Sequence, residues 1–367
     1  MFTILDNAEK LKEIDRSNML NALVKTPDYC RDAIKRAKRV KVSKKVQPKN
    51  IVVLGMGGSA IGGEILCDWL KDRLPTPIEV CRDYTLPAYV DRDTLLFAIS
   101  YSGNTEETLN AFLTAIKRGC TVLTLTSGGL LKEFSSKMKL PQVKIPSGLQ
   151  PRAAIPYIFF PLPVLMEKLG IISNTQNELE EAIAMLEKVS KSNAPATPTK
   201  SNKAKQLAAE LTQTMPVVYG FRQYTSIVHR LKAQFNENSK LPCRASTFPE
   251  LNHNETVGYE APEDINKMQT IILVRDPEEP IEIGSRIETT KNLAFSKAQK
   301  VLEIWADGKG KLAKMLSVLI VGDYASVYLA ILQNKDPTPV NIISKVKEEV
   351  AKKTCMKEQF EAELQKI

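Results

Sequence analysis

Hydroxyl side chains crowd the end of one apolar run of the sequence. In FAISYSGNTEETLNAF (97–112), Ser100, Ser102 and Thr105 surround a single glycine before a helical pattern begins. A helix N-terminus needs only one hydroxyl as a cap, with a following glutamate reaching back in a capping box. Three hydroxyls beside the free amides of a helix can instead satisfy the oxygens of a phosphate monoester. The loop therefore favours phosphate binding over capping alone.

A glycine-rich loop follows another apolar run, in GMGGSAIGGEIL (55–66). Gly55, Gly57 and Gly58 allow a tight turn and a close backbone approach to a ligand, while the following helix presents its amides and dipole to an anion. The spacing also fits the dinucleotide-binding pattern G-x-G-x-x-A. Three interpretations stay open at this point: a site for any phosphate, a dinucleotide site, or glycines that serve only the turn.

Alternating strands and helices must position these two loops. The pattern is typical of an α/β fold with a doubly wound, mostly parallel sheet, in which ligands bind at the carboxyl ends of the strands. Both loops lie at such ends. Short β-rich runs occur at 50–55, 78–80, 94–100, 121–126 and 142–146, with amphipathic stretches expected between the first four.

A second series of the same kind follows, so we expect two α/β domains in tandem. The stretch KSNAPATPTKSNK (191–203) is rich in Pro, Ser, Thr and Asn and indicates a linker. The expected domains are 1–190, including a basic helical N-terminal extension, and 204–367. The second series comprises β-rich runs at 215–220, 270–274 and 301–306 and a long helical pattern from about Lys311 to Leu332.

The composition is that of an ordinary globular protein. Of 367 residues, 43% are hydrophobic and 25% charged. The opening MFTILDNAEKLKEIDR lacks the apolar stretch of a signal peptide, and we find no later run that approaches the ~20 apolar residues of a membrane span. We therefore expect a cytoplasmic protein with no membrane partner.

Cysteines and histidines are too few and too scattered to suggest a metal site. The chain has two histidines and no C-x-x-C pair. We expect free buried thiols and no zinc. The six cysteines are Cys30, Cys67, Cys81, Cys120, Cys243 and Cys355.

Basic charge is concentrated near the N-terminus. The net charge is +9, and residues 1–50 hold 13 Lys and Arg against 6 Asp and Glu, which accounts for +7 of it. Most of the excess lies in RDAIKRAKRVKVSKK (31–45), which lacks the interleaved aromatics of a nucleic-acid-binding arm. The segment predicts a solvated helix face and no nucleic-acid partner. A basic protein also suits an anionic small substrate.

Several motifs together resemble one enzyme family. SYSGNT resembles the phosphate-binding loop of sugar isomerase domains, and further motifs are similar to those of the bifunctional phosphoglucose/phosphomannose isomerases of archaea and bacteria. The resemblance covers roughly residues 50–347 and implies two sugar isomerase domains in tandem. The further motifs are GGSAIGG (57–63), PRAAIPY (151–157), FNENSK (235–240), ELNHNE (250–255) and DPTPV (336–340).

The resemblance implies a set of catalytic residues. Glu237 is the carboxylate that moves a proton between C2 and C1 of the sugar, a task for a glutamate in a partly dry pocket. His253 opens the sugar ring, since an imidazole titrates near working pH, whereas His229 lies in a helical pattern and is interpreted as structural. Arg152 lies near the reacting carbons, where its fixed charge can stabilise an enediolate; a surface ion pair is the alternative.

The resemblance also implies substrate contacts and one further cation. Lys345 and Lys347 both fit the family's spacing for a site lysine, and Lys347 is preferred. Thr338 is implied to leave room for both C2 epimers of the substrate. The contacts implied for the sugar phosphate are Gly58, Ser59, Ser100, Ser102, Thr105 and Thr338.

The function expected on this resemblance is aldose–ketose isomerisation. Glucose 6-phosphate and mannose 6-phosphate would interconvert with fructose 6-phosphate through a cis-enediol, with no cofactor and no metal. The family implies a homodimer in which His253 reaches the partner's site. A non-catalytic sugar-phosphate-sensing protein is one alternative and would need only the loops. An NAD(P)-dependent dehydrogenase, using Arg82 or Asp83, is the other and leaves SYSGNT unexplained.

Overall fold

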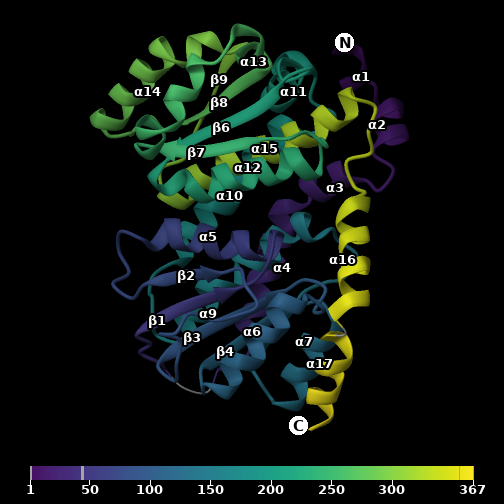
Figure 1. Cartoon of the computed structure of the whole chain (residues 1–367), viewed down its shortest axis with the longest axis vertical. Coiled ribbons are helices and arrows are strands. Elements are labelled where there is room, and N and C mark those ends of the chain that lie inside the picture. The colour runs from purple at the N-terminus through teal and green to yellow at the C-terminus, as the bar shows by residue number, and fades with distance from the viewer. Residues whose placement is uncertain (1, 43–44, 355, 367) are drawn as a thin grey trace. The chain divides into compact units, whose positions relative to one another are not determined.

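The structure, a computed structural model, describes residues 2–42, 45–354 and 356–366 (Figure 1). Packing divides it into two compact units. Unit 1 combines the segment up to Pro27 with Asn177–Pro339, and unit 2 combines Asp28–Gln176 with the segment from Val340 on. These units describe packing, and the expected division into 1–190 and 204–367 stays a prediction.

Unit 2 is built on a five-stranded sheet in the order β2-β1-β3-β4-β5, with every pair of neighbours parallel. The positions of all five expected strands are confirmed. Alternate residues of β1 and β3 face opposite sides of the sheet, so both sides are apolar and both are covered by helices. The strands are β1 Asn50–Leu54, β2 Ile78–Cys81, β3 Thr94–Ser100, β4 Thr121–Thr126 and β5 Gln142–Lys144.

One face of this sheet packs on α6 and α7, and α17 packs on these two helices. Apolar residues of the sheet, of α6 and α7 and of α17, among them Phe360 and Leu364, form a single core cluster. On the other side, α5 packs on α8, which continues into α9. The helices of unit 2 are α4 Thr26–Arg39, α5 Gly58–Leu70, α6 Glu106–Lys117, α7 Gly129–Lys137, η1 Pro151–Ala154, α8 Ile155–Phe159, α9 Pro161–Lys168, α16 Asn341–Thr354 and α17 Met356–Gln365.

The amphipathic helix expected between β2 and β3 is absent, and this part of the prediction was wrong. Residues 82–93 contain neither helix nor strand. The carboxylate of Asp83 accepts from the amide of Thr85, and that of Asp91 from the amide of Asp93. Such local side-chain bonds offer the backbone an alternative to helical pairing.

Unit 1 is built on a four-stranded parallel sheet in the order β7-β6-β8-β9. The expected strands at 215–220, 270–274 and 301–306 are confirmed. β7 was not expected, because RASTF is a mostly polar, half-buried edge strand without an apolar run. The strands are β6 Met215–Phe221, β7 Arg244–Phe248, β8 Gln269–Arg275 and β9 Lys300–Trp305.

The helices of unit 1 surround this sheet. α12 and α14 connect its strands, and α15 packs on α11 and α12. The helices are α1 Phe2–Leu5, α2 Ala8–Ile14, α3 Met19–Val24, α10 Gln176–Asn193, η2 Thr199–Ser201, α11 Lys203–Glu210, η3 Arg222–Tyr224, α12 Thr225–Glu237, η4 Glu250–His253, η5 Glu255–Glu260, α13 Glu263–Lys267, α14 Ile281–Leu293, η6 Phe295–Lys297 and α15 Lys311–Leu332.

The long helix expected from Lys311 to Leu332 is α15. Contrary to the sequence-based expectation, its length and mean hydropathy of 1.9 do reach those of a membrane span. Of its most apolar window, however, 94% is buried inside the protein. α15 is therefore the central core helix of unit 1, and it is apolar all round because protein surrounds it.

The basic segment 31–45 begins on α4 as a solvated helix face. Ala33 and Ala37 are buried, whereas Arg31, Lys35 and Lys38 are exposed. This is the amphipathic pattern of a surface helix, and the charge needs no nucleic acid to explain it. Residues 43 and 44 of the segment lie outside the described residues.

Candidate active site

The crevice of unit 2 lies where its strand order changes direction. From β1 the chain passes through α5 to β2 on one side, and from β3 through α6 to β4 on the other. Because parallel crossovers are right-handed, α5 and α6 cover opposite faces, and both helix N-termini lie at the carboxyl ends of β1 and β3. A Cβ at Gly55 would lie 3.0 Å from the Ile99 carbonyl oxygen, so the glycine-rich loop lies against the end of β3.

The hydroxyls of the 100–105 loop bond to one another and to the loop backbone. Ser100 is buried, its Oγ lies 2.9 Å from Thr105 Oγ1, and it accepts the Gly103 amide at 3.0 Å. Thr105 is the N-cap residue of α6 but makes no side-chain capping hydrogen bond. Ser102 is exposed and accepts the amide of Asn104. This geometry argues against capping as the reason for three hydroxyls.

A second loop, residues 126–131, holds the hydroxyl loop rigid. Gly103 has φ +75°, and a Cβ there would lie 1.8 Å from the Gly128 carbonyl oxygen. Only glycine combines this left-handed backbone with so close an approach. The Gly103 carbonyl in turn accepts the Leu131 amide at 3.0 Å, and Asn104 Oδ1 accepts the Leu130 amide at 3.0 Å. These contacts fix the backbone of the 100–105 loop within the protein.

Three further predicted residues meet at the start of α5. At the start of α5, a Cβ on Gly58 would lie 3.1 Å from the Pro151 carbonyl oxygen and 3.3 Å from the Arg152 nitrogen. Ser59 follows and is buried. Arg152, on η1, is only 3% exposed, which is inconsistent with a surface ion pair. Unit 2 thus brings together Gly58, Ser59 and Arg152.

In unit 1, Glu237 is the last residue of α12 and is partly buried. The two residues after it attach the helix end to α15. Asn238 Nδ2 donates to Ser326 Oγ at 2.9 Å, and Ser239 Oγ donates to the Ser326 carbonyl oxygen at 2.6 Å. The Glu237 backbone therefore has a fixed place at the end of the core helix pair.

The segment that carries Thr338 meets the same end of α12. Lys240 Nζ donates to the carbonyl oxygen of Glu237 and, at 2.9 Å, to that of Pro337. Thr338 is buried, and its amide donates to Asp336 Oδ1 at 2.9 Å. Two motifs far apart in sequence, FNENSK and DPTPV, are thus joined within unit 1.

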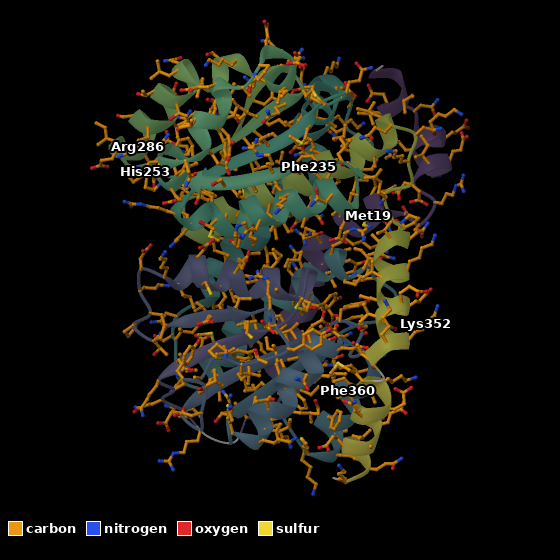
Figure 2. The ribbon with its side chains drawn as sticks, viewed as in Figure 1. Met19, Phe235, His253, Arg286, Lys352 and Phe360 are labelled. Atoms are coloured by element: carbon orange, nitrogen blue, oxygen red, sulfur yellow. The ribbon has the colours of Figure 1, made fainter. Side chains whose placement is uncertain are left out.

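His253 is the last residue of η4, which follows β7, and its side chain is exposed. Its neighbours hold the turn: Asn252 Nδ2 donates to Thr290 Oγ1 of α14 at 2.7 Å, and Asn254 Nδ2 donates to Glu250 Oε1 at 2.8 Å. Figure 2 places His253 at the α14 side of unit 1, beside Arg286.

Glu237 and His253 lie at opposite ends of β7. α12 runs back from the carboxyl end of β6 to its amino end before β7 begins, so Glu237 lies at the amino ends of the strands, whereas His253 follows the carboxyl end of β7. Five residues of strand span about 17 Å. Figure 2 shows Phe235, two residues before Glu237, well apart from His253 across unit 1. Glu237 and His253 of one chain are therefore separated by about the length of the strand.

The two candidate lysines lie on α16. None of the described residues of this helix is buried, and both Lys345 and Lys347 are exposed. The structure does not distinguish between them.

Within the described residues, no group of three or more His, Cys, Asp or Glu side chains could hold a metal ion. Cys30, Cys67, Cys81, Cys120 and Cys243 are free thiols, and Cys355 lies outside the described residues. Burial raises the pKa of the Cys67 and Cys243 thiols to about 12. These cysteines are therefore packing residues, not nucleophiles.

Comparison with known proteins identifies the family. A bifunctional phosphoglucose/phosphomannose isomerase of Caldicellulosiruptor bescii is 40% identical over 335 residues, 91% of this chain and 99% of that protein. The chain belongs to the bifunctional phosphoglucose/phosphomannose isomerase family. Within it, residues 46–131 match the SIS domain and residues 200–350 match the bacterial phospho-glucose isomerase C-terminal SIS domain.

Bifunctional phosphoglucose/phosphomannose isomerases have relatives of other specificity. The D-glucosamine-6-phosphate 4-epimerase of Sulfolobus acidocaldarius is 30% identical over 90% of this chain and 97% of its own. Among solved structures, a glucose-6-phosphate isomerase like protein of Thermus thermophilus matches with a TM-score of 0.61 at 18% identity, over 92% of this chain and 98% of that one. This likeness concerns the fold alone and agrees with two SIS domains.

Sequence reasoning did not single out Lys240, although this residue ends the FNENSK motif. The signal available was its position three residues after Glu237. Its role as a link becomes visible only with the Pro337 carbonyl beside it, because sequence does not reveal that α12 and α15 end at the same edge.

Proposed function

We propose that this member of the family interconverts glucose 6-phosphate and mannose 6-phosphate with fructose 6-phosphate, without cofactor or metal. The observation that carries the proposal is the rigid hydroxyl loop at the β1/β3 crevice. Ser100 and Thr105 point their hydroxyls at one another and leave the N-terminus of α6 without a side-chain cap. Phosphate oxygens suit such a set of hydroxyls and amides. Gly58, Ser59 and Ser102 complete the proposed phosphate and sugar contacts.

The proposed reaction moves one proton between two carbons. Once the ring is open, Glu237 removes the C2 proton of the aldose, the C2–H electrons form a C1=C2 double bond, and O1 takes a proton to give the cis-enediol. Glu237 then returns its proton to C1 as the O2 hydroxyl loses its own, which yields the ketose. Arg152 and one lysine, Lys347 or Lys345, stabilise the negative oxygen during these steps.

Both epimers can use this base because their enediol is the same. Glucose 6-phosphate and mannose 6-phosphate differ only at C2, which is planar in the enediol. Rotation about C2–C3 therefore presents either face to one carboxylate, and the proposed role of Thr338 is to leave room for it.

Ring opening is assigned to His253 of a second copy of the chain, which makes the working form a homodimer. The support is the placement of Glu237 and His253 at opposite ends of β7, together with the exposure of His253. In this arrangement a site takes Glu237 from one protomer and His253 from its partner. We place the enzyme in the cytoplasm, among soluble sugar phosphates.

The test is product formation from each aldose phosphate in D₂O, followed by NMR. An isomerase gives fructose 6-phosphate from both aldoses and places deuterium at C1 or C2. A 4-epimerase such as the Sulfolobus relative would change C4 and leave C2 unlabelled. Absence of fructose 6-phosphate from both substrates would overturn the proposal, and reaction of only one epimer would reduce it to a single isomerisation.

A further inference from the structure

Lys240 adopts a backbone conformation that lysines rarely adopt. Its φ is +58°, in the left-handed region, just past the end of α12. Glycine is the usual residue there, since a side chain costs about 1 kcal/mol or more in this conformation. The chain nevertheless carries a lysine, and its side chain makes contacts that glycine could not make.

The contribution is a bridge between two carbonyl oxygens. Lys240 Nζ donates to the Glu237 oxygen, at the C-terminus of α12, and to the Pro337 oxygen at 2.9 Å. A cation is favourable beside the last carbonyls of a helix, which lack helical partners. The Pro337 oxygen belongs to a different segment, the one that carries Thr338. The ammonium group thus ties the helix end that carries the base to the residue just before Thr338.

Other hydrogen bonds of this region hold the end of α12 to α15. Asn238 and Ser239 hold the end of α12 to Ser326, whose own Oγ donates to the Asp323 carbonyl oxygen at 2.7 Å. Asp323 forms a buried bidentate pair with Arg230, with distances of 3.1 and 2.7 Å. These bonds secure α12 on α15. Lys240 links this end of α12 to Pro337 through its hydrogen bond to the Pro337 carbonyl oxygen.

We propose that Lys240 is a positioning residue that sets the separation between the Glu237 carboxylate and Thr338, and thereby the relative rates of the two C2 epimers. The inference rests on the proposed function, in which Glu237 is the shared base and Thr338 the neighbour of the rotating sugar. The two epimers need different rotations about C2–C3, so a shift of Thr338 relative to Glu237 affects them unequally. Lys240 itself does not touch substrate.

The experiment compares kcat and KM for glucose 6-phosphate and mannose 6-phosphate in four variants. Lys240→Met keeps the length and removes the charge, Lys240→Gly suits the left-handed backbone, and Lys240→Arg keeps the charge. Lys335→Met, an exposed lysine of the adjoining segment, is the matched control. Because misplacement of a reacting group costs rate steeply, Lys240→Met and Lys240→Gly should lower kcat about tenfold and change the ratio of the two activities at least about threefold.

The conservative variant and the control separate positioning from stability. Lys240→Arg should retain the wild-type ratio within about twofold, and Lys335→Met should match wild type. An unchanged ratio in folded Lys240→Met or Lys240→Gly would overturn the inference, even if the thermal midpoint falls, because loss of stability lowers both activities alike. A wild-type chain that converts neither aldose, or only one, would overturn the proposed function and this inference with it.

Discussion

The sheets of unit 1 and unit 2 have the same strand order over four strands. The carboxyl ends of β1 and β3 in unit 2 therefore correspond to the carboxyl ends of β6 and β8 in unit 1. We call the first, with the 100–105 loop, the hydroxyl edge. The second, the ionic edge, consists of Tyr224, Arg275–Glu279 and Lys314. At the hydroxyl edge, the 100–105 loop carries neutral hydroxyls and no charged side chain. At the ionic edge, charged side chains neutralise one another.

Carboxylates fill the ionic edge. Asp276, only 2% exposed, accepts from Tyr224 Oη at 2.6 Å and from Lys314 Nζ at 3.1 Å. Arg275 is likewise buried and bonds to three glutamates, at 2.5 Å to Glu279, 2.6 Å to Glu288 and 2.9 Å to Glu303. An anion brought there would meet carboxylates and would have to break these pairs. The comparison teaches that a sheet edge is available to a phosphate only where the chain leaves it uncharged and polar.

We expect that a mutation can abolish proton transfer and leave binding of the sugar phosphate intact. This prediction has the largest expected effect. Glu237 lies away from the ionic edge, at the amino ends of the strands of unit 1. Glu237→Gln should lower isomerisation at least ~10²-fold while 6-phosphogluconate, which cannot isomerise, still binds. Steady-state kinetics and calorimetry measure the two properties, with exposed Glu282→Gln as control. Near-normal turnover would remove Glu237 from the mechanism.

Because Glu237 and His253 lie at opposite ends of β7, we expect that a second inactive chain can partly restore the activity lost in Glu237→Gln. Homodimers of Glu237→Gln and of His253→Ala should both be nearly inactive. After co-refolding in equal amounts about half the dimers are mixed, and each holds one site with both mutations and one with neither, so about a quarter of wild-type activity should return. Dimers, verified by light scattering, that gain no activity would place both residues in the site of one chain.

Disruption of the ionic edge should affect stability and leave binding alone. Lys314→Met removes the cation that faces buried Asp276, so the free energy of unfolding should fall by about 3 kcal/mol. The affinity for 6-phosphogluconate should stay at the wild-type value. Denaturant unfolding and calorimetry check the two halves, with exposed Lys309→Met as control. Loss of affinity in folded Lys314→Met would mean that the ionic edge, too, takes part in binding.

Disruption of the hydroxyl edge should have the reverse effect. Ser100→Ala and Thr105→Ala each remove a proposed hydrogen bond to phosphate, so the affinity for 6-phosphogluconate should weaken by about 1–3 kcal/mol. The thermal midpoint should change little in Thr105→Ala, as in Ser136→Ala on the exposed side of α7, whereas Ser100→Ala also removes the acceptor of the Gly103 amide and should lower it. If stability drops and affinity does not, the loop is a structural turn and the contrast between the edges disappears.

The smallest expected effect is a loss of stability of the ionic edge at low pH. The hydrogen bond from Arg275 holds the pKa of Glu288 below its ordinary value of 4.5. A carboxyl with a depressed folded-state pKa contributes stability above its unfolded pKa and loses it as pH falls through the folded one. The difference in thermal midpoint between wild type and Arg275→Met should therefore shrink below about pH 4.5. A difference independent of pH would show that Arg275 acts by packing, for example on Trp305.

Much of the fold could be predicted because buried parallel strands are continuous apolar runs. β1, β3, β4, β6 and β8 have that signature, and α15 is a longer apolar run. β7 could not be recognised, since an edge strand buries too little to need apolar residues. The helix expected at 82–93 failed for a local reason, the competing bonds of Asp83 and Asp91. Contacts between the first 27 residues and unit 1 are tertiary and leave no local pattern.

The candidate site divides in the same way. Ser100 and Thr105 could be named from hydroxyl count and helix position alone, and the structure gives them a shared hydrogen bond. Glu237 and His253 depend on the family resemblance, because an isolated glutamate or histidine has no local signal for catalysis. The ionic edge was not predicted because RDPEEP is typical of an acidic turn, and Lys314, which pairs with Asp276, comes from elsewhere in the chain.

The interleaving of the two units has a consequence for synthesis on the ribosome. The chain passes between them at residues 27–28, 176–177 and 339–340. α3 is synthesised early, and it buries Met19, Leu20 and Leu23 in unit 1. α15, on which α3 packs, begins only at Lys311. At 5–20 residues per second, nearly 300 residues of elongation take about 15–60 s. These apolar side chains remain without their partners in α15 during that time. The core of unit 2 is completed later still, by Phe360 and Leu364 of α17. A nascent chain stopped at the 191–203 stretch would therefore expose incomplete cores in both units.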